Sequence, residues 1–227
     1  MGEEKQSAGE LFDKRVEDYD SFVHSTVIGY DDILESLKQI AKIFVKTDKP
    51  AILDLGVGSG NSALALLEDF PNASLTGYDV SQKMVEKTRE RFKKFDYTGV
   101  CDNAVNIGFE NKFDLVISSI VLHHLSDEDK QRTYKKIFNA LKVGGVFVLA
   151  DVMVASSKKL NEHLHEKWSK FIAFKRGEEY RDKILGLDQE HHQYAALNDN
   201  QKFLQQAGFK TEVFYRNLNS AIVIGFK

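Results

Sequence analysis

Ala51-Ile52-Leu53-Asp54-Leu55-Gly56-Val57-Gly58-Ser59-Gly60 is the stretch that decides the fold of this 227-residue chain. An apolar run that carries one acid gives way to three glycines at every second position, and a helical apolar pattern follows at once. This order predicts a buried parallel strand, a tight turn and a helix N-terminus, where open α/β sheets bind nucleotide-like ligands. Glycines suit the turn because they reach backbone angles closed to other residues and let a ligand lie against the main chain.

Two acids suggest the class of ligand. The glycine spacing is G-x-G-x-G, whereas the dinucleotide-binding pattern is G-x-G-x-x-G. Asp79 ends a second apolar stretch, 19 residues after Gly60, where an acid can accept hydrogen bonds from ribose hydroxyls. Asp54 would repel a pyrophosphate but suits a ligand with an ammonium group. A nicotinamide-dependent oxidoreductase is therefore the weaker alternative.

Five segments in order resemble the class I S-adenosylmethionine-dependent methyltransferases: Leu53–Gly60, Gly77–Met84, Phe113–Ser118, Leu122–Leu125 and Leu141–Phe147. The resemblance implies a Rossmann-like α/β sandwich with a seven-stranded, mostly parallel sheet in the order 3-2-1-4-5-7-6. Strand seven is antiparallel in that family, helices cover both faces, and a helical cap closes over the cofactor.

Periodicity and turn residues place the elements along one domain. We expect strands at 51–55, 74–79, 98–101, 113–118, 145–151, 211–216 and 220–226. We expect helices at 8–24, 30–45, 81–95, 127–142, 156–185 and 198–206, with Ser81 capping the third. The domain divides into N-terminal helices (1–48), a cofactor-binding core (49–151), a cap (152–197), and a C-terminal helix with a hairpin (198–227).

The resemblance also implies a site for S-adenosylmethionine, with S-adenosylhomocysteine as product. Asp54 is expected to reach the ammonium group of the cofactor, and Asp79 both ribose hydroxyls. Asp102 is expected to accept the adenine amine, with the backbone of Asn103 beside it. The methionine end of the cofactor is expected to lie on the glycine loop (Gly56, Val57, Gly58, Gly60). The adenine is expected to contact Val80 and Met84, and the sulfonium to lie beside Ser118 and Ser119.

Catalytic residues are harder to assign, because a sulfonium is already an activated leaving group and the enzyme mainly aligns the reactants. A general base is needed only if the acceptor must lose a proton. His123, which follows the fourth strand, and His191 and His192 in the cap are candidates, against the simpler interpretation that they are packing or surface histidines. The sequence contains no Cys/His metal-site pattern.

Four segments carry a closer resemblance over nearly the whole chain: Phe12–Val16, Val27–Tyr30, Asp54–Gly56 and Leu204–Phe209. They resemble the carboxy-S-adenosylmethionine synthase branch, which makes a modified cofactor for tRNA wobble-uridine modification. This resemblance implies that Tyr30 reaches the cofactor. The stretch 183–187 lacks the arginine that pairs with the extra carboxylate in that branch, and Ser119 replaces its asparagine. We therefore favour a methyltransferase, and keep the synthase and a non-catalytic S-adenosylmethionine-binding protein as alternatives.

Composition limits the partners. The net charge of −3 and the mixing of lysines with acids disfavour a nucleic-acid substrate without excluding one. A small-molecule acceptor is expected instead. The single cysteine, Cys101, and the lack of a secretory or membrane-spanning apolar run predict a cytoplasmic protein that does not bind membranes. The oligomeric state stays open, with a homodimer as one option.

Overall fold

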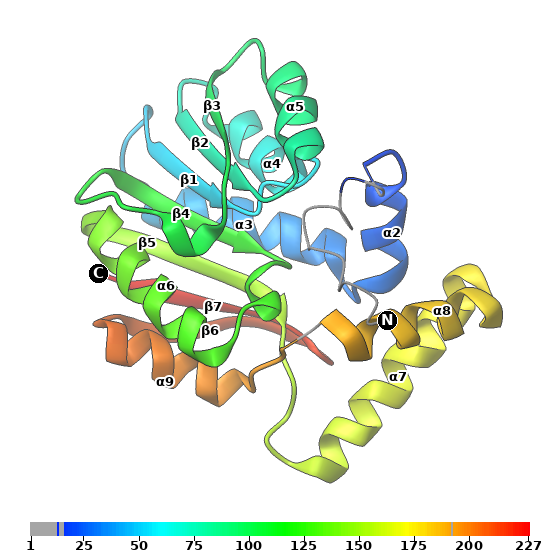
Figure 1. Ribbon diagram of the computed structural model, residues 1–227. Coiled ribbons are helices and arrows are strands. Elements are labelled where there is room, and N and C mark those ends of the chain that lie inside the picture. The colour runs from blue at the N-terminus through cyan, green and yellow to red at the C-terminus, as the bar shows by residue number, and fades with distance from the viewer. Residues whose placement is uncertain (1–12, 14–15, 192) are drawn as a thin grey trace, which may run out of the picture.

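Seven strands form one sheet in the order β3-β2-β1-β4-β5-β7-β6 in the computed structural model, which describes residues 13, 16–191 and 193–227 (Figure 1). β7 runs antiparallel to both of its neighbours, and the pairs among β1 to β5 are parallel. This confirms the predicted topology. The strands are β1 (Ala51–Leu55), β2 (Ser74–Asp79), β3 (Asp96–Cys101), β4 (Phe113–Ser119), β5 (Leu141–Val152), β6 (Lys210–Asn217) and β7 (Ser220–Phe226).

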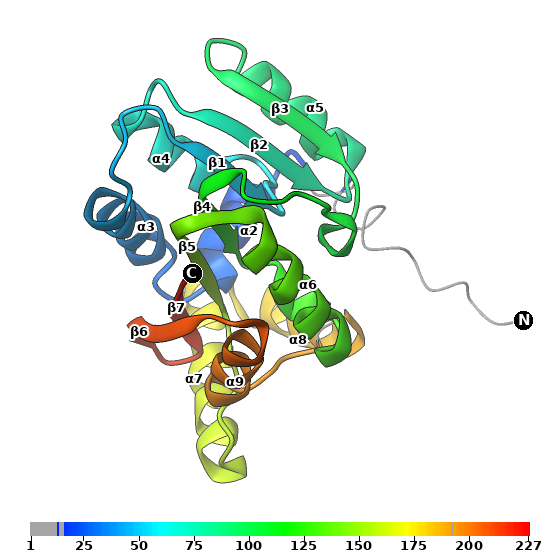
Figure 2. The ribbon, with the colours of Figure 1, turned by 90° about the vertical axis from the view of Figure 1, so that its left-hand side faces the viewer.

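Helices cover both faces of the sheet (Figures 1 and 2). One face carries α3 (Tyr30–Phe44), α4 (Asn61–Asp69) and α5 (Gln82–Arg91), and the other carries α6 (Asp127–Ala140) and α9 (Leu197–Ala207). Two short 3₁₀ helices, η1 (Ala104–Asn106) and η2 (Leu122–His124), follow β3 and β4. Among the described residues no helix is long and apolar enough to cross a membrane.

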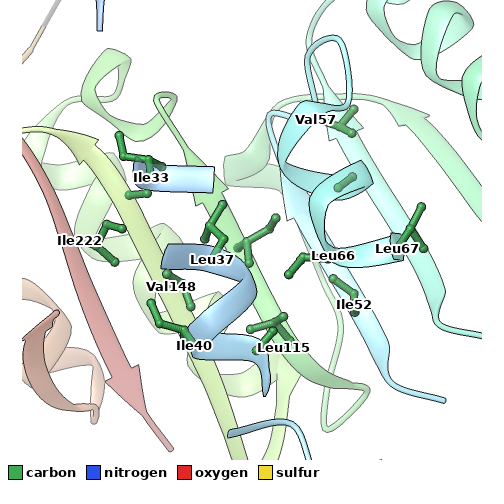
Figure 3. Close-up of a cluster of buried hydrophobic side chains, with 14 of the residues drawn as sticks. Ile33, Leu37, Ile40, Ile52, Val57, Leu66, Leu67, Leu115, Val148 and Ile222 are labelled. Atoms are coloured by element: carbon green, nitrogen blue, oxygen red, sulfur yellow. The ribbon is translucent and has the colours of Figure 1, made fainter. Parts of the chain in front are cut away.

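The α3 face of the sheet holds one of two large apolar clusters (Figure 3). Ile33, Leu37 and Ile40 recur at helical spacing on α3 and are fully or almost fully buried. They pack on every second residue of the strands beneath them, such as Leu115 of β4 and Ile222 of β7. Alternate side chains of a strand point to the same face of the sheet. The cluster holds α3 against the sheet and so stabilises the strands whose carboxyl ends are described below.

The cap consists of two helices, α7 (Lys158–Arg176) and α8 (Glu178–His191), where the sequence predicts one. Gly177, with a φ of 88°, ends α7 and lets the chain turn back. Trp168 of α7 donates a hydrogen bond from Nε1 to the backbone oxygen of Thr26 at 2.6 Å and packs with Ile28. The cap is therefore attached to α2 (Tyr19–Thr26).

Further boundaries differ from the prediction, and α5 ends at Arg91, four residues earlier than expected. α2 begins at Tyr19 after a turn at 16–18, and residues 8–12 of the expected first helix lie outside the described part of the chain. β3 begins two residues earlier than expected. β5 begins at Leu141, which pairs with Phe113 of β4 before the register shifts across the stretch that contains Gly144. Ser81 caps α5 as predicted, and its hydroxyl accepts a hydrogen bond from the Met84 N–H at 3.1 Å.

Candidate functional site

The glycine turn after β1 brings the backbone close to two other elements. Gly56, Gly58 and Gly60 have φ values of 78°, 51° and 89°, which glycine adopts without strain. The Gly56 N–H donates to the Tyr78 oxygen at 2.8 Å. A Cβ atom on Gly56 would lie 2.2 Å from the nearest carbon of Val121. The first glycine is therefore required both by its backbone angle and by the residue packed on it.

Asp79 joins the tip of β2 to this turn. Its carboxylate is 8% exposed and accepts hydrogen bonds from the N–H groups of Gly58 and Ser81, at 2.8 and 2.9 Å. Burial raises its pKa, although these backbone hydrogen bonds act in the opposite direction. Each carboxylate oxygen can accept more than one hydrogen bond, so Asp79 keeps capacity for a ligand's hydroxyl groups.

Asp54 is a buried carboxylate without a partner. It is 1% exposed, and neither of its oxygens has a hydrogen-bond partner within the described residues. Burial first, and the nearby charge of Asp79 second, raise the pKa of Asp54 to about 8. Buried carboxylates are normally paired, because an isolated charge in a protein interior is costly. The arrangement therefore suits a ligand with a positive group.

A hollow of about 780 Å³, part of it open solvent, lies beside these residues at the carboxyl ends of β1, β2, β3 and β4. Seven predicted site residues line it: Gly56, Gly58, Asp79, Val80, Met84, Asp102 and Asn103. Eight others line it without having been predicted: Tyr19, Tyr78, Ala104, Ile120, Val121, Leu122, His124 and Leu125. The wall is largely apolar and the charged side chains in it are acids, which suits a flat heterocycle together with a cationic group.

The remaining predicted residues are not part of the lining of the hollow: Tyr30, Asp54, Val57, Gly60, Ser118 and Ser119. Tyr30 is buried, stacks edge-on against His24 with ring centroids 4.9 Å apart, and has its pKa raised to about 12 by burial. Val57 and Gly60 belong to the turn itself. Ser118 points to the α6 face of the sheet. Its hydroxyl donates a hydrogen bond to the Leu55 backbone oxygen at 3.1 Å.

Ser119 differs from its neighbour. Its side chain is on the same face as Ile117, and its hydroxyl is buried with no partner in the described part of the structure. Ile120 follows with a φ of 59°, which is a rare and strained angle for a β-branched residue. Strain of this kind often accompanies functional sites. Ser119 and Ile120 thus form a sharp bend where β4 meets the hollow.

Helix α2 is hydrogen-bonded to the glycine turn through Asp20. Its carboxylate accepts hydrogen bonds from Ser59 Oγ at 2.5 Å and from Asn61 Nδ2 at 2.9 Å. Arg91 supports both partners by donating to the Ser59 oxygen and to Asn61 Oδ1. Although burial opposes it, these hydrogen bonds lower the pKa of Asp20. Tyr19 is thereby held against Gly58 at the wall of the hollow.

The candidate catalytic histidines occupy different environments. His123 is 4% exposed and does not line the hollow, and its Nδ1 is 2.5 Å from the carboxylate of Asp151. Its neighbour His124 lines the hollow instead. The side chain of His191, at the end of α8, and the whole of His192 lie outside the described residues. Within those residues no group of three or more His, Cys, Asp or Glu side chains could hold a metal ion.

Comparisons with known proteins give the family to which the chain is similar. Residues 52–145 match the family described as "Methyltransferase domain". The carboxy-S-adenosyl-L-methionine synthase of Actinobacillus succinogenes is 30% identical over 233 aligned residues, which cover 95% of this chain and 92% of that protein. An uncharacterized methyltransferase of Bacillus cytotoxicus is 29% identical over 143 residues, covering 63% of this chain and 66% of that protein.

Solved structures share the fold at lower sequence identity. The PH0226 protein of Pyrococcus horikoshii has a TM-score of 0.66 and 18% identity, and the match covers 94% of this chain and 98% of that chain. PigF, solved with SAH, has a TM-score of 0.68 and 14% identity, and the match covers 99% of this chain and 63% of that chain.

Proposed function

Because the chain belongs to the class I S-adenosylmethionine-dependent methyltransferases, in the branch similar to carboxy-S-adenosylmethionine synthases, we propose that it transfers a methyl group to a small-molecule acceptor. We assign the hollow beside the glycine turn to the cofactor, S-adenosylmethionine. The cofactor supplies an activated methyl group, and the chain's residues bind it, orient it and exclude water.

The unpartnered carboxylate of Asp54 is the observation that carries this assignment. S-adenosylmethionine ends in an ammonium group, which would pair with that carboxylate directly or through one water molecule. The pairing would offset the cost of the buried charge and return the pKa of Asp54 toward its ordinary value. A pyrophosphate at the same position would instead add negative charge next to Asp54 and Asp79.

The other contacts follow from the same orientation of the cofactor. Asp79 would accept the ribose hydroxyls while its bonds to Gly58 and Ser81 hold it in place. Val80 and Met84 would pack against the adenine, and Asp102 would accept its exocyclic amine. Tyr19 would cover the methionine end. We retain the division of the domain stated above, with residues 152–197 as a cap that controls how the acceptor enters.

Isothermal titration calorimetry with S-adenosylmethionine and S-adenosylhomocysteine tests the cofactor assignment. We expect both to bind with one site per chain, and NADH to show no binding. Incubation with methyl-labelled S-adenosylmethionine and a library of small acceptors then tests the transfer. Binding of NADH without binding of either adenosyl compound would overturn the proposal.

Carboxy-S-adenosylmethionine synthesis is the second candidate, favoured by the similarity to the Actinobacillus succinogenes enzyme over 95% of the chain. The hollow supports it less well. Its charged lining residues are Asp79 and Asp102, and neither lysine nor arginine appears in its lining among the residues described. A carboxylated cofactor would bring a further negative charge to this environment without a cation to balance it.

Mass spectrometry of the small molecule that copurifies with the protein separates the two candidates. S-adenosylmethionine or S-adenosylhomocysteine is the expected ligand for a methyltransferase. A ligand heavier than S-adenosylmethionine by one CO₂ would favour the synthase.

A further inference from the structure

Buried polar atoms without partners gather at one edge of the sheet. In the described chain these atoms include both carboxylate oxygens of Asp54, the hydroxyls of Ser119 and Ser220, and the side-chain oxygen of Asn219. Ser220 is fully buried and Ser119 is 8% exposed. An unpaired buried polar group lowers stability by about 1–3 kcal/mol. Several such groups at one edge of a sheet therefore call for an explanation.

Strand register shows that three of these residues form a row. Asp54 pairs with Ile117 of β4, and Ser119 lies two residues farther along that strand. Ser119 pairs with Ala150, which pairs with Ile222 of β7, and Ser220 lies two residues before Ile222. All three therefore lie at the carboxyl edge of the parallel strands.

The three side chains also share a face. Asp54, Ser119 and Ser220 have the same parity as Ile52, Ile117 and Ile222, which all belong to the apolar cluster on the α3 face. Asn219, immediately before β7, extends the row at its far end. Three strand spacings of about 4.8 Å separate β1 from β7, and Ser220 lies four residues along β7 from Ile224, the residue level with Asp54. The row therefore runs diagonally across the sheet, and its ends are about 19 Å apart. That length accommodates the amino-acid end of a cofactor and a small second ligand.

We propose that Ser119, Asn219 and Ser220 form the acceptor subsite, and that it takes a neutral molecule with hydroxyl or amide groups. This inference rests on the proposed methyl transfer, because it assigns Asp54 to the cofactor and the rest of the row to the acceptor. Hydroxyl and amide groups pair with neutral donors and acceptors. No lysine or arginine belongs to the row as described, so a carboxylate or phosphate would lack a counter-charge there.

The turn between α2 and α3 covers the β7 end of the row. Val27 belongs to the same buried cluster as Ile222, and Ile28 packs with Leu218. Trp168 of the cap holds this turn through the Thr26 oxygen. An acceptor that reaches Ser220 therefore displaces the α2–α3 turn, which makes the cap contact part of acceptor entry.

Hydroxyl removal tests the row without knowledge of the acceptor. A buried hydroxyl whose hydrogen-bond partner is a ligand has no partner in the free protein, and this lowers stability. Ser119→Ala and Ser220→Ala are therefore each expected to raise the melting temperature by about 2–4 °C. Thr133→Val is matched for the loss of an unpaired hydroxyl, because Thr133 also has a buried hydroxyl without a partner in the described structure but lies on α6, at the opposite face. Its melting temperature should rise by a similar amount, so fragment binding must then distinguish the two serines from Thr133. A lower melting temperature for both serine variants would overturn the proposal.

Fragment soaking tests the chemistry of the subsite. Crystals grown with S-adenosylhomocysteine are soaked with neutral phenols, alcohols and amides, and in parallel with carboxylates and phosphates. We expect neutral fragments with a polar atom about 2.7–3.2 Å from Ser119 Oγ or Ser220 Oγ, retained in Thr133→Val and lost from β7 in Ser220→Ala. Anionic fragments in the row, or fragments that bind only elsewhere, would contradict the inference.

The same crystals separate this inference from the proposed function. If S-adenosylhomocysteine occupies the hollow and no neutral fragment reaches the row, the acceptor subsite fails and the cofactor assignment stands. If S-adenosylhomocysteine does not bind at all, the proposed function fails.

Discussion

Replacing Asp54 with asparagine should raise the stability of the ligand-free protein at neutral pH. The carboxyl of Asp54 has a pKa of about 8 in the fold, against an ordinary value of 3.8 for an aspartate side chain. Because the folded pKa is the higher one, stability falls as pH rises from about 4 and levels off above about 8. At 1.36 kcal/mol per pKa unit, the loss by pH 7 is at most about 4 kcal/mol. An asparagine side chain does not ionise, so this loss disappears in the Asp54→Asn variant.

Thermal melts from pH 5 to pH 8.5 measure the effect. For a domain of this size about 1 kcal/mol corresponds to about 2–4 °C. We expect the melting temperature of the wild type to fall relative to Asp54→Asn by about 4 °C or more over this range. Asp102→Asn serves as the control, because Asp102 lines the hollow but is exposed. Parallel pH profiles for the wild type and Asp54→Asn would refute the description of Asp54 as a buried, unpaired acid.

Ligand affinity in the same variant tests the role of the charge. Loss of one partner from a buried ion pair costs about 2–5 kcal/mol, so S-adenosylmethionine should bind about 30-fold more weakly or worse. Methylthioadenosine, which lacks the amino-acid end, should bind the wild type and Asp54→Asn equally. Equal loss for both ligands would mean that the substitution damages the fold rather than the ammonium contact.

Three further variants test other parts of the site. Asp79→Ala should weaken S-adenosylmethionine binding by more than about tenfold, since a hydrogen bond to a charged group contributes about 1.5–3 kcal/mol, and unchanged affinity in calorimetry would contradict the ribose assignment. Gly56→Ala should lower the free energy of unfolding, measured in urea, by about 1–3 kcal/mol, because a Cβ atom at position 56 would lie 2.2 Å from Val121. Adding Val121→Ala to the same chain should restore part of the loss. Trp168→Phe removes the hydrogen bond to Thr26 and should lower the free energy of unfolding by about 1 kcal/mol. Cofactor affinity should stay within about threefold of the wild type, and a large loss would mean that the cap contact takes part in cofactor binding.

Much of the fold could be predicted because local signals agreed with the tertiary structure. The buried strand 51–55, the glycines after it and the apolar face of α3 each determine one element, and all three were confirmed at or near their predicted bounds. The cap was less predictable. A single glycine in a long charged helical pattern is weak evidence for a helix end, and the reversal at Gly177 also depends on the packing of α8 against α7.

The site shows the same contrast. Residues that follow strands in the sequence, such as Asp79 and Asp102, line the hollow because the carboxyl ends of parallel strands share an edge. Tyr19, Ile120 and Leu125 line it as well, but their positions depend on how α2 docks and on the strained bend after β4, which no spacing in the sequence encodes. The row of unpaired groups could not be predicted from the sequence either, because its residues lie on strands that are distant in the chain.

A crystal structure of the protein with S-adenosylhomocysteine is the most direct test of the central claim. The account predicts the ammonium nitrogen within direct or single-water hydrogen-bonding reach of Asp54, and both ribose hydroxyls on Asp79. A ligand bound with its amino-acid end away from Asp54, or a site elsewhere on the chain, would contradict it.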